Sequence, residues 1–466
     1  MAVALHRPGR ASAPTLAGAA LALALLSATA PCWAQEQIEQ QEPTPSSVEQ
    51  VATPMERTFI PSVLAAPLEL LPALKERLKD APPFLRDTKV DVNLRTFYFN
   101  RENYDDSRQE ALATGGALSY RSGWLLDTLS IGSVLYTSQP LYGPDNRDGT
   151  RLLLEGQEGY TVLGQLYARL KLLDRNFVNL YRYTYDTPYI NRDDSRMTPK
   201  TFEGYTLQGS VGGEGGAPVL RYGGGYITKI KERNDDDFIW MSRPAGARVD
   251  RGVSLAGALV SYGGLSVGGI DYYCDDVINI AYGEVTYLLP LADGAGVLVS
   301  TQYVDQRSVG QNFLAASAFD TDLFAVKAEA SYAGAVFTLA WSRAARGADL
   351  VNPWSGNPGY TGAQIQKFNR AGEQALLVKA SYDFAPLGAP GLTAYALFVH
   401  GWSRVSPTTG AEVANENEVD LDVQWRPKRL AGLWLRARYG HVEQYQAPKN
   451  AMTEIRLIVN YDFSIL

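Results

Sequence analysis

Cysteine and histidine are scarce in this chain of 466 residues, which contains two Cys and three His. Cys32 lies in an N-terminal segment that we expect to be removed, so Cys274 would remain alone and no internal disulfide could form. Histidine is the most frequent general base in enzymes and a common metal ligand. Because only His400 and His441 would remain, the sequence predicts no enzyme, no metal site and no cofactor.

The chain also lacks a net positive charge and long apolar runs after its N-terminus. The formal net charge is -7, which gives no indication of a nucleic-acid partner. Beyond residue 34 there is no uncharged apolar run of 18 or more residues, so the sequence predicts no transmembrane helix. The mean hydropathy of -0.17 does not argue against a membrane protein, because about half of the residues of a water-filled barrel face water.

The N-terminus has the three parts of a secretory signal peptide. His6, Arg7 and Arg10 form a basic start, and residues 16–30 form a mostly apolar run. Small residues then stand at the -3 and -1 positions before a cleavage site after Ala34. We therefore predict that residues 1–34 are a signal peptide and that the mature protein leaves the cytoplasm.

Residues 35–86 differ in composition from the rest of the chain. The segment 35–54 is rich in Gln, Glu, Pro and Ser, which predicts disorder. The segment 59–79 has helical spacing interrupted by prolines, so it is either a short periplasmic helix or plug, or only a tether. We predict a periplasmic extension over 35–86.

The last fifty residues show strict alternation of two kinds of side chain. One face of the segment 418–426 carries Val419, Leu421, Val423 and Trp425, and the other carries Glu418, Asp420, Asp422, Gln424 and Arg426. This period of two predicts strands with two very different faces. One hairpin of a soluble sandwich could look similar. Strands of about 10 residues, many of which end in an aromatic, indicate instead a barrel with lipid outside and water inside.

The same pattern recurs from residue 87 to the C-terminus. We predict an all-β fold, an 18-stranded antiparallel transmembrane β-barrel over 87–466. The predicted strands are 87–100, 109–121, 124–138, 158–173, 176–187, 201–213, 216–232, 248–263, 266–278, 280–290, 294–306, 320–332, 334–344, 372–384, 391–404, 416–426, 432–446 and 451–463.

The predicted connections alternate in length. Links after even strands are short and rich in turn residues, as in Arg121-Ser122-Gly123 and Ala333-Gly334. Links after odd strands are mostly longer and more polar: 139–157, 188–200, 233–247, 307–319, 345–371 and 405–415. Short turns on one side and long loops on the other are typical of bacterial outer-membrane barrels.

At this point the sequence resembles the OprD family of outer-membrane porins. The resemblance covers about residues 85 to 466 and depends on four stretches: 90–101 (VDVNLRTFYFNR), 194–204 (DSRMTPKTFEG), 368–373 (FNRAGE) and the close 458–461 (IVNY). It implies a monomeric or loosely trimeric barrel whose third and seventh loops fold inward. It also implies a ladder of basic side chains that guides carboxylate-bearing solutes. The third loop, with Asp193 and Asp194 beside Arg192 and Arg196, has mixed charge, so anion preference stays open.

Ten basic residues are assigned to the lumen by alternation and would form this ladder: Arg95, Arg169, Lys171, Arg182, Lys229, Lys327, Lys379, Arg436, Arg438 and Arg456. In a water-filled pore they would attract anionic groups and raise their rate of entry. The competing interpretation is cross-strand pairing with carboxylates such as Glu329, Asp422 or Glu454, which would stiffen the wall.

Eight further residues are candidates for the constriction: Asp193, Asp194, Ser195, Arg196, Tyr360, Lys367, Asn369 and Arg370. On spacing alone they would belong to ordinary solvated loops. The family resemblance places them in the two inward loops instead.

The sequence thus predicts a passive channel for small hydrophilic solutes, such as carboxylates or amino acids, in the outer membrane of a Gram-negative bacterium. Expected partners are outer-membrane lipid, the barrel-assembly machinery during biogenesis and the solutes. Alternatives are a non-conducting adhesion or assembly barrel, and a barrel hydrolase. A Gly-x-Ser-x-Gly match at 264–268 lacks the following helix that a nucleophile elbow needs.

Overall fold

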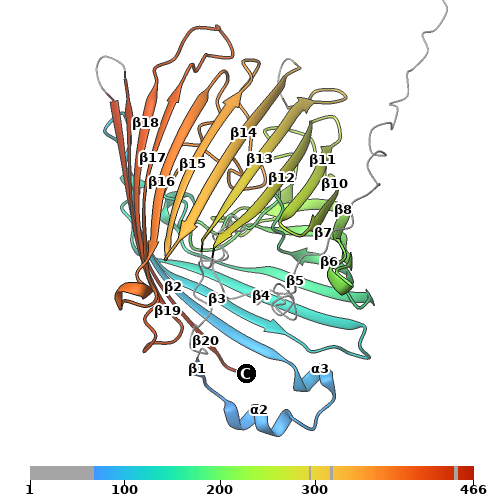
Figure 1. Cartoon of the computed structure of the whole chain (residues 1–466). Helices are drawn as coiled ribbons and strands as arrows, with labels where there is room; N and C mark the ends of the chain where they lie inside the picture. Colours follow the sequence, from blue (N-terminus) through green and yellow to red (C-terminus); the bar gives the residue numbers. More distant parts are fainter. Residues whose placement is uncertain (1–67, 293–294, 315–317, 446–449) are drawn as a thin grey trace, which may run out of the picture. The chain divides into compact units, whose positions relative to one another are not determined.

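A computed structural model describes residues 68–292, 295–314, 318–445 and 450–466. Within these ranges, eighteen long antiparallel strands form a closed barrel, because the first, β2 (Lys89–Glu102), pairs with the last, β20 (Asn450–Ser464). Figure 1 shows the strands side by side in chain order. The predicted fold class and strand number are confirmed. The predicted signal peptide and the segment 35–54 lie outside the described residues.

The strands between these two follow one another around the wall. They are β3 (Arg108–Arg121), β4 (Leu129–Tyr142), β5 (Tyr160–Leu173), β6 (Asn176–Tyr183), β7 (Thr201–Gly212), β8 (Val219–Lys231), β10 (Val253–Tyr262), β11 (Leu265–Cys274), β12 (Ile278–Ala292), β13 (Ala295–Ser308), β14 (Asp320–Tyr332), β15 (Ala335–Ala344), β16 (Gln374–Asp383), β17 (Leu392–Trp402), β18 (Glu416–Trp425) and β19 (Leu433–Gln444). The two-residue strand β9 (Ile239–Trp240) pairs only with the upper end of β8.

Several predicted strands have different bounds in the structure; β10 begins at Val253 rather than 248, for example, and β11 ends at Cys274 rather than 278. For two others the cause is clear. β4 begins at Leu129 rather than 124, because Leu126 and Asp127 both have positive φ and form a turn. The apolar residues before Leu129 had disguised that turn in the sequence. β6 ends at Tyr183 rather than 187, because the chain then leaves the wall, and Tyr185 and Tyr189 pack inside the barrel.

Burial in this barrel is the reverse of burial in a soluble protein. In β18 the apolar residues Leu421 and Val423 are 48% and 47% exposed, whereas Glu418 and Asp420 are at most 1% exposed. Exposed apolar residues recur along the other strands, and buried polar residues recur between them. Such a wall is stable only with lipid outside and polar groups inside.

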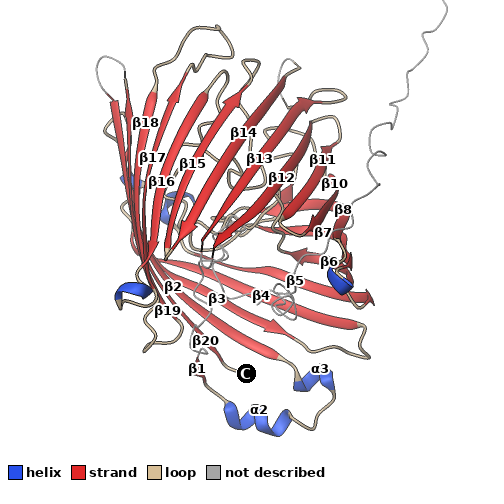
Figure 2. Cartoon of the chain, viewed as in Figure 1, coloured by secondary structure: helices blue, strands red, loops and turns tan. Residues whose placement is uncertain are grey.

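A short arm precedes the barrel. β1 (Leu68–Glu69) pairs in parallel with the end of β20, and two short helices follow, α2 (Pro72–Leu78) and α3 (Pro83–Arg86). Figure 2 shows these helices at the lower end of the barrel, where Figure 1 marks the C-terminus. The helical spacing of 59–79 is thus realised over 72–78. In the described part of the chain, no helix combines the length and the apolar content needed to cross a bilayer.

Candidate functional site

The third loop, residues 184–200, is fixed to the basic side of the wall. Arg95 on β2 donates to Asp194 Oδ1 over 2.6 Å and to the Arg196 carbonyl over 2.6 Å. Its Nε donates to Asn460 on β20 over 2.8 Å. Arg95 is 5% exposed, so a ladder residue predicted to meet solute serves mainly to hold the loop across the lumen.

Further contacts fix the same loop from the extracellular side. Arg196 Nε donates to the Thr150 carbonyl over 2.9 Å, and Asp193 forms a 2.8 Å ion pair with Arg233. Although burial raises the pKa of the Asp193 carboxyl, the cations Arg233 and Lys200 outweigh burial and lower that pKa overall. Asp193 therefore stays ionised and keeps its ion pair with Arg233.

The seventh loop, residues 345–373, is fixed to the acidic row on β18. The backbone N–H groups of Ile365 and Gln366 donate to the two oxygens of Glu418, over 2.6 and 2.7 Å. The N–H of Gln364 donates to Asp420 Oδ2 over 2.8 Å. Three consecutive backbone donors thus stabilise two buried carboxylates by hydrogen bonds, and the loop covers this wall.

The two inward loops also contact each other. The N–H of Gly356 donates to Asn191 Oδ1 over 3.1 Å, and Trp354 Nε1 donates to the Met241 carbonyl over 2.6 Å. Trp354, Tyr189 and Ile190 belong to one buried apolar cluster. This cluster packs both loops against the wall formed by the middle strands.

A narrow cavity remains between the third loop and the basic wall. It is lined by Arg95, Phe97, Asp194, Ser195, Arg196, Trp434, Arg436, Arg438, Arg456 and Ile458. Asp422 Oδ2 lies 2.7 Å from Arg436 and 2.9 Å from Arg438, while Arg456 pairs with Glu454. Five arginines therefore face three carboxylates, counting Asp194, and the lining carries net positive charge. We refer to it below as the eyelet.

Three other predicted ladder residues lie beside aromatic rings. Lys327 forms a 2.8 Å ion pair with Glu329, and its Nζ lies 4.9 Å from the centre of the Tyr360 ring. Lys379 Nζ lies 4.6 Å from the Tyr395 ring centre. Arg169 lies over Phe177, at 3.9 Å. None of the three lines the eyelet, so any role in transport is at another depth of the pore.

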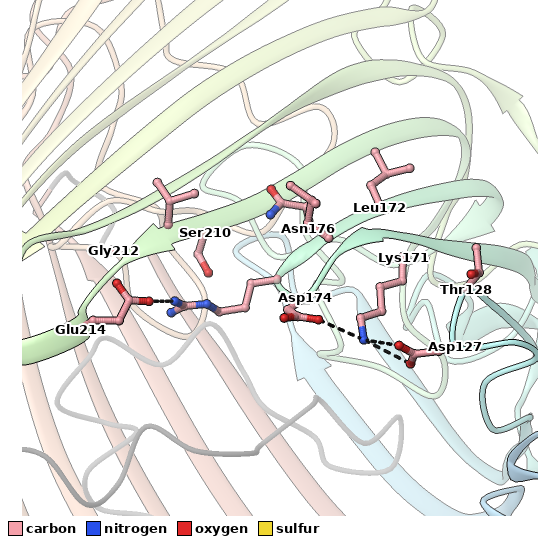
Figure 3. Close-up of a pocket in the computed structure, with 12 residues that line it drawn as sticks. Asp127, Thr128, Lys171, Leu172, Asp174, Asn176, Ser210, Gly212 and Glu214 are labelled. Carbon is pink, nitrogen blue, oxygen red and sulfur yellow. Dashed lines mark hydrogen bonds and ion pairs between the residues drawn. The ribbon is translucent and has the colours of Figure 1, made fainter.

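Lys171 lies at the periplasmic rim. Its Nζ is 3.1 Å from Asp127 and 3.4 Å from Asp174. These side chains lie in a shallow depression that Arg175 and Glu214 also line (Figure 3). The side chain is thus engaged by two carboxylates of the turns. Pairing, the competing interpretation from the sequence, describes it better than solute contact.

The prediction that Arg182 and Lys229 face the lumen is not met in the structure. The register places both opposite Glu203, and Glu203 alternates in phase with Tyr205, which is 55% exposed on the outer face. A β-bulge between Glu203 and Gly204 sets two residues of β8 against one of β7, so the alternation on β8 inverts there. The assignment of these two side chains to the lumen is therefore wrong.

The predicted constriction residues divide into two groups. Asp194, Ser195 and Arg196 line the eyelet, and Asp193 supports them through Arg233. In the seventh loop, the Tyr360 hydroxyl donates to Glu284 over 2.5 Å, and Arg370 donates to Gln366 over 2.8 Å.

Asn369 is buried at the end of that loop, where its carbonyl accepts from the Leu350 N–H. The Lys367 side chain reaches solvent, but the protein groups packed around it lower the pKa of its ammonium by desolvation, and nearby Lys200 lowers that pKa further. The structure does not bring these four residues into the eyelet.

Sequence reasoning missed two groups of functional residues. Trp434 lines the eyelet but was placed only in an alternating strand. Gln364, Ile365 and Gln366 act through backbone N–H groups, for which a sequence carries no side-chain signal. The acidic row was visible as Glu418 and Asp420, but only its contacts show that it binds a loop.

A closed barrel with an apolar exterior, a charged interior and two loops held across its lumen defines the porin class of outer-membrane channel. Comparison with protein families makes this specific. Residues 82–465 match the family described as outer membrane porin, OprD family. The chain belongs to the OprD family of porins, which are located in the Gram-negative outer membrane.

Individual relatives agree with this assignment. The chain is 26% identical over 409 residues to the porin-like protein GalP of Pseudomonas putida. The alignment covers 83% of this chain and 94% of GalP. It is 23% identical over 434 residues to porin D of Pseudomonas aeruginosa, and this alignment covers 83% of this chain and 93% of porin D.

Among solved structures, OccK9 (OpdG) of Pseudomonas aeruginosa superposes with a TM-score of 0.73 at 25% identity, covering 82% of this chain and all of that one. OpdK of the same species, crystallised with vanillate, gives a TM-score of 0.70 at 22% identity. The superposition covers 82% of this chain and all of OpdK.

Proposed function

We propose that this porin favours small solutes that carry a carboxylate, and that the eyelet arginines select them. The observation that carries the proposal is the excess of arginine over carboxylate in and around the lining of the eyelet. The opposite, acidic wall is covered by the seventh loop, so its charge is screened from a passing solute. A desolvated guanidinium pairs with a carboxylate in planar, bidentate geometry.

Two further observations support this class of solute. Phe97 and Trp434 line the eyelet beside the arginines and offer apolar contact to a ring or short chain. A structural neighbour was crystallised with vanillate, an aromatic carboxylate. The residues do not favour the hydrolase alternative, because Ser266 lies inside β11 opposite Ser261 and a strand, not a helix, follows the turn.

Planar-bilayer recording tests the proposal. The purified protein should conduct, prefer anions, and be blocked by benzoate added to one side. Replacing Arg436 and Arg438 together with Gln should weaken the benzoate block by roughly tenfold or more, because a focused positive potential raises local anion concentration. Lysine at both positions keeps the charge and should retain most of the block.

The matched control is Arg343→Gln, which removes one positive charge from an exposed position near the end of β15. It should leave the block unchanged. A double Gln variant that is blocked as well as the parent would refute selection by these arginines, although conduction itself would stand. Absence of any current from correctly folded protein would favour the adhesion or assembly alternative.

A further inference from the structure

We propose that the arm formed by residues 70–79, containing α2, inserts its leucine face into the periplasmic leaflet of the outer membrane. The partner is phospholipid at the boundary between headgroups and acyl chains. The arm would then be an interfacial anchor beside the barrel rather than a plug or a free tether.

The first argument is the level at which the arm leaves the barrel. The N–H groups of Leu70 and Leu71 donate to the carbonyls of Ser464 and Ile465, over 2.9 and 3.1 Å. Just before these residues, Tyr461 and Phe463 pack 6.0 Å apart and continue the row of Leu457 and Val459, which are 48% and 44% exposed to lipid. Aromatic rings at strand ends mark the membrane interface, so α2 begins at that interface.

The second argument is the apolar face of the helix. Leu71, Leu74 and Leu78 are spaced by three and four residues and share one side of α2. No residue of α2 is buried. The exposed fractions of Leu70, Leu71 and Leu74 are 48%, 45% and 40%. A seven-residue helix is unstable alone in water and requires an apolar partner for such a face.

The third argument is that the arm is held at both of its ends. Beyond α2, the Phe84 carbonyl accepts from the Gly123 N–H over 3.0 Å. A Cβ at position 123 would lie 2.0 Å from the Pro83 carbonyl, so only glycine fits this contact. The arm therefore runs along the rim from the end of β20 to the β3–β4 turn and stays at the end of the barrel that carries the C-terminus (Figure 1).

The charges of the arm decide what kind of attraction is involved. Lys75 pairs with Glu69, and Lys79 pairs with Glu76, so two of its cations are already engaged. The apolar face, rather than attraction to anionic headgroups, therefore drives insertion. Insertion should occur equally in zwitterionic and in anionic vesicles.

Spin-label accessibility tests the proposal in the full chain with both cysteines replaced (Cys32→Ser, Cys274→Ala). A nitroxide is attached at Leu74→Cys or, as the matched control on the opposite side of α2, at Ala73→Cys. Each protein is placed in phosphatidylcholine vesicles, with and without phosphatidylglycerol. Relaxation by oxygen, which concentrates in lipid, is compared with relaxation by a water-soluble nickel chelate.

The Leu74 label should be relaxed several times more strongly by oxygen than by the chelate in both kinds of vesicle, and the Ala73 label should show the reverse. Strong relaxation of the Leu74 label by the chelate would place the face in water and overturn the proposal. Weak relaxation by both agents would also overturn it, because the face would then be covered by protein, including the chain's own preceding segment. Heat-dependent gel mobility confirms that each variant has folded.

Discussion

At the scale of single residues, most predicted ladder cations are ion-paired, but an ion pair does not always use up the positive charge. Arg436 and Arg438 share the carboxylate of Asp422, so the pair still carries one positive charge in excess. Arg95 is the opposite case, because its guanidinium is fully used by Asp194, Asn460 and a backbone carbonyl. Pairing and solute contact are thus separate properties, and the number of partners decides between them.

Glu373, just before β16, gives a prediction at this scale. Burial raises the pKa of its carboxyl to about 7, because Arg370 N–H reaches only one oxygen and the other has no hydrogen-bond partner. The folded state therefore favours the protonated form. Its stabilising effect is complete below pH 4.5, falls by about 1.4 kcal/mol per pH unit as pH rises, and is lost above about pH 7.

Urea unfolding at pH 4.5 and pH 8 measures this effect. The parent should lose roughly 3 kcal/mol more unfolding free energy between these pH values than Glu373→Gln, which cannot ionise. Equal pH dependence of the two proteins would show that Glu373 is already ionised in the folded protein.

At the scale of elements, each inward loop is bound to a wall of suitable charge. Carboxylates of the third loop meet Arg95 on β2 and Arg233 just beyond β8, and backbone N–H groups of the seventh loop meet carboxylates on β18. The arrangement leaves more arginines than carboxylates in the lining of the eyelet. Loop attachment and the anion preference that we propose would therefore have one structural cause.

Glu418→Ala tests this attachment. It removes the acceptor of two buried N–H groups, each of which costs about 1–3 kcal/mol when left unpaired. The seventh loop should loosen, and single-channel current should become larger and noisier, with weaker anion preference as Asp420 is uncovered. Glu412→Ala, at an exposed position of the neighbouring loop, is the control and should leave the current unchanged. Identical currents from both variants would show that other contacts suffice to hold the loop.

At the scale of the whole molecule, the apolar exterior predicts an unusual response to surface mutation. Leu421 is 48% exposed in the middle of β18. Leu421→Arg would be nearly neutral on a soluble surface, but in a bilayer it should lower the unfolding free energy by about 2–4 kcal/mol.

Leu430→Arg is the control for this prediction. Leu430 is 56% exposed in the β18–β19 turn, outside the apolar band, and its replacement should change stability by less than about 0.5 kcal/mol. Unfolding in vesicles by urea measures both variants. Equal stability would contradict the assignment of the outward row to lipid.

The sequence by itself determined the fold class, the strand order and which loops are long. These follow from alternation and from turn residues, which are local properties that do not depend on distant contacts. It also indicated Asp194, Ser195 and Arg196 as constriction residues, although only through the family resemblance.

Only the tertiary structure decided which lumen cations remain available to a solute. The bulge beside Glu203 reversed Lys229, the register of β6 placed Arg182 opposite the outward Glu203, and the seventh loop met the acidic row through backbone groups. Alternation along a strand indicates which face of the barrel wall a side chain occupies. It does not indicate which loop or side chain contacts that face. The charge at the eyelet depends on contacts between segments more than a hundred residues apart, such as the hydrogen bond from Arg95 to the Arg196 carbonyl, which the chain acquires only when it folds into the barrel.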